Sequence, residues 1–114
     1  MLVYINLIGK NFWGDDLQIA YKNKAIEKIC VDAYEAEKKH GSAMAEKIHL
    51  RIDQISAAPS VEELVQNRVG RCHLLQHNRR GQYAMDLIQP QRLVFSRKED
   101  NTQVVVIHEI IDYH

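Results

Sequence analysis

Residues 81–98 read GQYAMDLIQPQRLVFSRK, and this stretch decides the expected fold class. It contains two short runs, 83–88 and 93–97, in which aromatic, β-branched and other apolar side chains predominate. Runs of this length and composition are typical of β-strands. Pro90 stands between them and favours a turn, because proline has no N–H to donate to a neighbouring strand. The stretch therefore predicts two strands joined by a turn.

Similar runs lie on both sides of this stretch. Residues 73–75 (His-Leu-Leu) precede it, and residues 103–111 follow it after the turn-forming sequence Glu99-Asp100-Asn101-Thr102. At the start of the chain, the nearly continuous apolar run 2–8, closed by Gly9, predicts a strand buried on both faces. Residues 11–21 are irregular and are interpreted as a loop.

Between these strands the apolar period changes to that of amphipathic helices. A first helix is expected over about 22–39, with Gly41 as its C-terminal stop, and a second from the N-cap Ser42 to just before Pro59. Residues 60–63 (Ser-Val-Glu-Glu) fit a capping box and predict a short helical turn. The apolar stripes are Ile26, Ile29, Cys30, Ala33 and Tyr34 in the first helix and Met44, Ile48, Ile52 and Ile55 in the second.

This order of elements predicts an α+β fold. An N-terminal strand, a two-helix hairpin and a mostly antiparallel sheet of about four strands would place the helices on one face of the sheet. The 114 residues suit a single domain, 1–114.

The composition excludes several classes of protein. No run approaches the roughly 18 apolar residues of a membrane span, and no signal peptide is evident, so we expect a cytoplasmic protein without a membrane partner. Cys30 and Cys72 are far apart in the sequence and are expected to be free thiols. His73 and His77 lack a credible cysteine or carboxylate set around them, so no metal and no cofactor are expected.

The positive charge is concentrated in one part of the chain. The formal net charge is zero, but residues 68–98 hold seven Lys/Arg and a single acid, Asp86. Six of these seven are arginine, which suits planar, bidentate contact with phosphate. The segment therefore predicts a nucleic-acid-facing patch within a neutral protein.

The chain also carries the groups that RNA cleavage by 2′-OH attack requires. The reaction needs a base, an acid and fixed positive charge around the phosphate, and histidine and arginine are the natural suppliers. His73 lies within the cationic segment, and the chain ends on Asp112, Tyr113 and His114 directly after an apolar run. We expect folding to bring this end of the chain to the arginines, with Tyr113 stacking on a base or contacting a phosphate.

At these residues the sequence resembles a known family. The stretches 72–75, 79–85 and 91–95, with the closing residues 111–114, are similar to the HigB branch of the RelE/ParE toxin superfamily. The resemblance implies a RelE-like fold and a metal-independent, ribosome-dependent endoribonuclease, the toxin of a type II toxin–antitoxin pair. It also implies three partners: a helix-turn-helix antitoxin of the HigA kind, messenger RNA in the ribosomal A site, and the RNA of the small ribosomal subunit.

The resemblance assigns roles to individual residues. His73 matches the catalytic histidine, Arg92 the phosphate-contacting arginine, and Asp112, Tyr113 and His114 the C-terminal functional triplet. The expected RNA-binding residues are Arg71, Gln76, His77, Arg79, Arg80, Arg97 and Lys98. Gln76 stands where many relatives have a catalytic lysine, so a phosphate-binding charge is lost and either His77 or Arg79 compensates or the activity is weak.

Two other functions remain open at this point. A ParE-like inhibitor of DNA gyrase would keep the fold and bind its target without catalysis, and a degenerate toxin would act only as a binding partner of its antitoxin. His73 and the terminal triplet favour the nuclease, whereas Gln76 leaves the alternatives standing.

Overall fold

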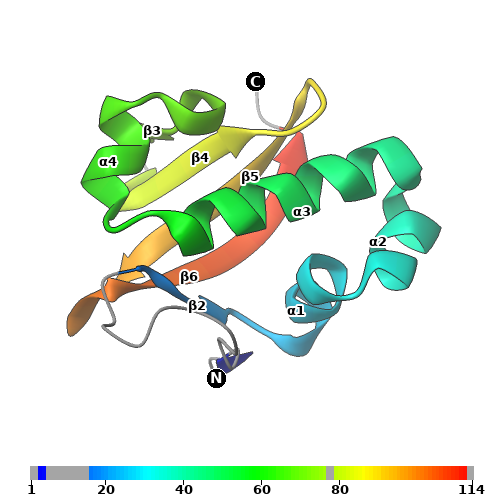
Figure 1. Cartoon of the computed structure of the whole chain (residues 1–114), viewed down its shortest axis with the longest axis horizontal. Helices are drawn as coiled ribbons and strands as arrows, with labels where there is room; N and C mark the ends of the chain where they lie inside the picture. The colour runs from blue at the N-terminus through cyan, green and yellow to red at the C-terminus, as the bar shows by residue number, and fades with distance from the viewer. Residues whose placement is uncertain (1–2, 5–15, 77–78, 113–114) are drawn as a thin grey trace.

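The computed structural model describes residues 3–4, 16–76 and 79–112. In these ranges six strands form one sheet in the order β1-β2-β6-β5-β4-β3 (Figure 1). The strands are β1 (Val3–Tyr4), β2 (Gln18–Tyr21), β3 (His73–Leu74), β4 (Gln82–Asp86), β5 (Gln91–Lys98) and β6 (Asn101–Asp112). β2 runs parallel to β6, and the other neighbouring strands are antiparallel. The expected α+β class with a mostly antiparallel sheet is confirmed.

The helices cover one face of this sheet. They are α1 (Lys24–Val31), α2 (Ala33–His40), α3 (Ser42–Ala57) and α4 (Val61–Gln66), followed by the 3₁₀ turn η1 (Val69–Arg71). In Figure 1 the long helix α3 crosses in front of the sheet. Its buried side chains Ile48 and Ile55 belong to the same core cluster as Tyr83, Met85 and Phe95 of the central strands.

The central hairpin explains why both faces of the sheet are apolar. Side chains alternate along a strand, so Leu93 and Phe95 join the helix-side core while Val94 points the other way. Val94 packs with Ala84 and Leu75 in a small second cluster. We call the face that carries Ala84 and Val94 the outer face.

The first predicted helix is wrong in one respect: the chain breaks into two helices at Asp32. This residue is extended (φ −114°, ψ 109°), and its side chain accepts hydrogen bonds from the backbone N–H groups of Tyr34 and Glu35. Asp32 thus ends α1 and caps α2, which a periodicity of apolar residues alone does not reveal.

The predicted cap of the next helix also needs correction. Gly41, with φ +86°, occupies both the end of α2 and the N-cap of α3, and Ser42 is already helical. The stop at Gly41 is therefore confirmed, whereas Ser42 is not the N-cap. The third cap is confirmed: the Ser60 hydroxyl accepts a hydrogen bond from the Glu63 N–H at the start of α4.

The N-terminal region contains a strand that the sequence interpretation missed. The interpretation of 11–21 as a loop is wrong for residues 18–21, which form β2, and residues 11–15 lie outside the described ranges. Ile19 and Tyr21 point into the core, and β2 pairs with β6 from Gln18↔Val104 to Tyr21↔Ile107. The predicted strand 2–8 is described only at Val3–Tyr4, which forms β1. No helix in the described ranges is long and apolar enough to cross a membrane.

Candidate active site

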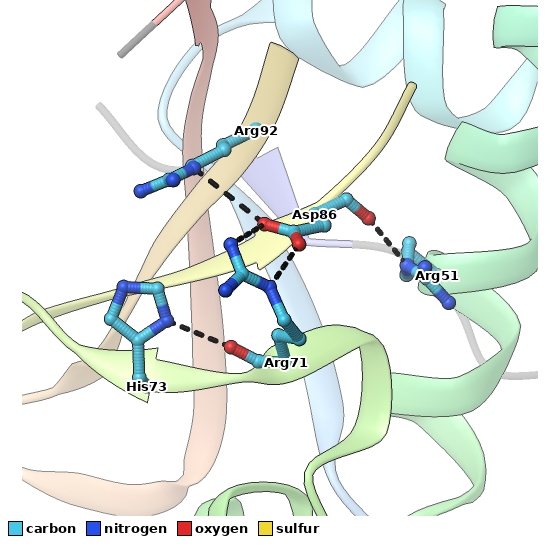
Figure 2. A network of polar contacts seen from close by, with 5 residues as sticks. All are labelled: Arg51, Arg71, His73, Asp86 and Arg92. Atoms are coloured by element: carbon cyan, nitrogen blue, oxygen red, sulfur yellow. Dashed lines mark hydrogen bonds and ion pairs between the residues drawn. The ribbon is translucent and has the colours of Figure 1, made fainter. Parts of the chain in front are cut away.

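One end of the sheet brings together His73 and several basic residues of the cationic segment. His73 comes from β3 and Arg92 from β5, while Arg71 ends the η1 turn beside them (Figure 2). They line an open pocket of about 430 Å³ together with Arg68, Val65 and Cys72. Three arginines and a histidine from the η1 turn, β3 and β5 therefore share one concave surface, which we call the arginine pocket.

Asp86 organises two of the arginines. It lies opposite Arg92 in the β4–β5 pairing, and the Arg92 Nε atom is 3.5 Å from its Oδ1 atom. The Arg71 Nε donates to Oδ2 of the same carboxylate, and its second nitrogen lies 3.3 Å from Oδ1. The carboxylate thus receives Arg71 and Arg92 at once (Figure 2).

These contacts keep the carboxylate ionised. Burial alone would raise the pKa of Asp86, but the hydrogen bond and charge of Arg71, with the charge of Arg92, lower the pKa below its ordinary 3.8. The Arg92 and Asp86 side chains are only 19% and 13% exposed, whereas the Arg71 side chain is 64% exposed. Arg92 is therefore held in place, and Arg71 presents its charge to solvent.

The turn that carries Arg68 and Arg71 has an unusual backbone. Arg68 (φ +53°), Gly70 (φ +57°) and Arg71 (φ +55°) all adopt left-handed conformations. For a residue with a side chain this costs on the order of 1–3 kcal/mol, and such strain persists where surrounding contacts hold it, often at functional sites. The turn thus directs two arginines toward one pocket against the local preference of the chain.

The tautomer of the neutral His73 ring, which lines the arginine pocket, is fixed by a main-chain contact. Its Nδ1 atom lies 2.7 Å from the main-chain oxygen of Arg71. A carbonyl oxygen can only accept a hydrogen bond, so the neutral ring carries its proton on Nδ1. The Nε2 lone pair of neutral His73 is then left to accept a proton from a ligand.

Cys72, between Arg71 and His73, is not a nucleophile in this arrangement. The side chain is buried, and burial raises the pKa of its thiol to about 12. A thiol with that pKa stays protonated at neutral pH. Cys30 is likewise a buried free thiol, as expected for both cysteines.

Asp112 lies on β6 beside the start of β5, close to Arg92 in the strand pairing. It is the last residue of β6 and pairs with Gln91, next to Arg92. Ile111, one residue earlier, pairs with Arg92 itself. Tyr113 and His114 lie outside the described residues, and so does His77.

The connection between β3 and β4 carries further predicted residues. The Arg79 side chain lies 2.7 Å from Glu109 on β6 and 3.1 Å from Gln82. Gln76 and Arg80 are exposed in the same connection. Arg79 thereby ties this connection to the strand that leads to Asp112.

Arg97 and Lys98 are not brought to the arginine pocket. Along β5, Arg97 falls on the face of Phe95, where it contacts Glu62 on α4 and the Tyr83 hydroxyl. Lys98 pairs with Asp100 in the β5–β6 turn, at the far end of the hairpin from Arg92. Their expected part in RNA binding gains no support from this geometry.

Asp86 and Arg68 are the site residues that the sequence interpretation left out. Asp86 is the single acid among the cations of 68–98, and this isolation was the available signal for an organising carboxylate. Across the described residues, no group of three or more His, Cys, Asp or Glu side chains is placed to hold a metal ion.

The fold is that of RelE-like proteins, as the sequence resemblance implied. A chain of the YoeB-YefM complex from Staphylococcus aureus is similar to this one with 21% identity and a TM-score of 0.57, covering 86% of this chain and 97% of its own. A second structure, a heterotetrameric YoeB-YefM toxin-antitoxin complex from the same organism, has 20% identity, the same coverage and a TM-score of 0.49. The sequence matches no protein-family model and no curated protein.

Proposed function

We propose that this protein is the toxin of a type II toxin–antitoxin pair and cleaves messenger RNA on the ribosome, in the manner of the HigB branch. The main support for this proposal is the arginine pocket. It is lined by Arg68, Arg71 and Arg92 together with His73, whose tautomer is fixed by the Arg71 main-chain oxygen. The similar chain from Staphylococcus aureus belongs to a YoeB-YefM complex, which supports a toxin–antitoxin role.

In the proposed reaction His73 acts as the base. Its Nε2 atom takes the proton of the 2′-OH, the 2′-oxygen forms a bond to the adjacent phosphorus, and the bond from phosphorus to the 5′-oxygen breaks. The departing 5′-oxygen receives its proton from the imidazolium of His114, the last residue of the triplet Asp112, Tyr113 and His114. The products end in a 2′,3′-cyclic phosphate and a 5′-hydroxyl, and no metal takes part.

The arginines supply the electrostatic part of catalysis. Arg92, held by Asp86, faces the phosphate on which negative charge develops, and the exposed Arg71 adds a second donor. Gln76, His77, Arg79 and Arg80 in the β3–β4 connection contact the flanking RNA. Gln76 brings no charge to this contact, so either His77 or Arg79 compensates for the missing lysine or cleavage is weak.

The proposed partners are those that the sequence resemblance implies. They are a helix-turn-helix antitoxin of the HigA kind, messenger RNA in the ribosomal A site, and the RNA of the small ribosomal subunit. The protein would act in the cytoplasm, where these partners are found.

Expression of the protein in growing bacteria, with mapping of new RNA 5′ ends, tests this function. We expect growth arrest and new 5′-hydroxyl ends within translated messages, both lost in Arg92→Gln. Arrest with intact messages and a DNA-damage response would contradict the nuclease and favour gyrase inhibition. Unarrested growth by a folded, well-expressed protein would leave only the binding-partner role.

A further inference from the structure

Arg51 of α3 reaches the end of β4 and the 68–71 turn, beside the arginine pocket. Its Nε donates a 2.7 Å hydrogen bond to the main-chain oxygen of Asp86, and another guanidinium nitrogen donates at 2.9 Å to Gln54 on the same helix. Figure 2 shows Arg51 and Arg71 approaching Asp86 from different sides, one toward the backbone oxygen and the other toward the carboxylate.

The same guanidinium lies against the backbone of the strained turn. A methyl group placed on Gly70 would come within 2.7 Å of the Arg51 Nε atom and 2.8 Å of its Cζ atom. Only a glycine allows this approach, and only glycine adopts its φ of +57° without cost. Arg51 is thus packed between the end of β4 and the turn that carries Arg68 and Arg71.

We propose that Arg51 is a positioning residue, which clamps the 68–71 turn onto the end of β4 and so orients Arg71 and His73 for catalysis. The inference rests on the proposed function for its catalytic meaning, although the orientation itself is measurable without it. Arg51 acts through Gly70 and Asp86 rather than by touching RNA.

The physical reason lies in the strain of the turn. Arg68 and Arg71 would relax toward ordinary backbone angles if nothing held them, because left-handed conformations are costly for residues with a side chain. Loss of Arg51 removes the contact on Gly70 and the donor to the Asp86 oxygen together. The Arg71 carbonyl oxygen would then lose its hydrogen bond with His73 Nδ1. Without that bond, both neutral tautomers of His73 would be populated.

The activity test compares Arg51→Ala with Lys47→Ala, which removes one positive charge from the same helix a turn earlier. In single-turnover cleavage on programmed ribosomes, we expect Arg51→Ala to slow the cutting step about 10- to 100-fold, as misplacement by about 1 Å can do, with little change in apparent affinity. Lys47→Ala should stay near the wild-type rate. Circular dichroism melting establishes that each variant is folded at the assay temperature.

A spectroscopic readout separates this inference from the proposed function. Nitrogen-15 shifts of the His73 ring report its tautomer, and we expect the Nδ1–H form in the neutral wild type and a mixture in Arg51→Ala. If the wild type cuts no RNA but the tautomer still changes, the nuclease proposal fails and the positioning role stands. If folded Arg51→Ala keeps the Nδ1–H form or cuts at the wild-type rate, the positioning role is overturned.

A double-mutant cycle with Gly70 tests the clamp directly. Gly70→Ala should slow cutting to a similar degree, since its methyl group displaces the guanidinium. Added to Arg51→Ala, the same substitution should slow cutting by a smaller factor than it does in the wild type, because only the strain of an alanine at φ +57° remains once the guanidinium is gone. Full additivity of the two effects would contradict a shared contact.

Discussion

His73 and Arg71 are joined by a 2.7 Å contact from the imidazole Nδ1 to the Arg71 main-chain oxygen, which fixes the tautomer of the neutral ring and leaves the Nε2 lone pair available to accept a proton. His73→Asn retains a side-chain donor for that oxygen but has no base. We expect it to lower the cleavage rate by about 10²- to 10⁴-fold, the usual contribution of general acid–base catalysis. His49→Asn, on α3, is the matched histidine control. Cleavage by folded His73→Asn at the wild-type rate would assign the base to another residue.

Arg92 and Arg97 lie on the same strand, β5, but their side chains lie on opposite faces of the sheet. Arg92→Gln should reduce the single-turnover cleavage rate by about 10²- to 10³-fold, because a preorganised donor to the developing charge is lost. Arg97→Gln should change that rate less than threefold. Equal losses in the two variants would mean that RNA also contacts the side of the sheet where α4 packs.

The ion pairs of Asp86 with Arg71 and Arg92 should make the stability of the fold depend on pH in the acid range. The pKa of Asp86 is lowered in the folded state, so its ionised form stabilises the fold above its unfolded pKa near 3.8, and this contribution is lost as the pH falls through the folded pKa. Asp86→Asn should unfold at lower urea concentration than the wild type at pH 6. The gap should narrow as the pH falls below about 4. A gap that does not depend on pH would show that the charge of Asp86 contributes nothing.

His108 should make stability depend on pH at higher values than Asp86 does. Burial lowers the pKa of His108 below 6.5, the charges of Lys22 and Arg79 act in the same direction, and Glu109 opposes them. As the pH falls below 6.5, His108 therefore takes up a proton in the unfolded chain before it does so in the folded chain. The free energy of unfolding falls as the pH drops through 6.5 toward the folded pKa of His108. His108→Gln, which retains a polar partner for the Ser96 hydroxyl at 2.7 Å, should flatten the dependence of urea stability on pH in the interval just below pH 6.5. An unchanged slope in that interval would rule out His108 as its source.

The sequence predicted the elements whose apolar period is long and regular. The four C-terminal strands and the α3 stripe were found at their observed places, because burial on a core imposes a period of two on strands and 3.6 on helices. The break at Asp32 and the strand β2 were missed for local reasons. Asp32 interrupts an apolar stripe with a side-chain cap, and β2 follows an irregular segment and gains its partner from the distant β6.

The candidate site was predictable in residue type but not in arrangement. A count of charges marked 68–98 as cationic, and the structure brings Arg68, Arg71 and Arg92 of that segment to one pocket. The same count could not separate Arg97 from Arg92, because the face on which a side chain falls depends on strand register. Nor could it reveal Arg51, whose role arises from a contact with Gly70 that only the folded chain creates.

In vitro cleavage of a defined message on programmed ribosomes tests the proposed reaction itself. The wild-type protein should cut the bound message and leave a 2′,3′-cyclic phosphate, and a single 2′-deoxy nucleotide at the cut position should block the reaction. A message that stays intact, or a deoxy-substituted message cut at the same position, would rule out cleavage by 2′-OH attack.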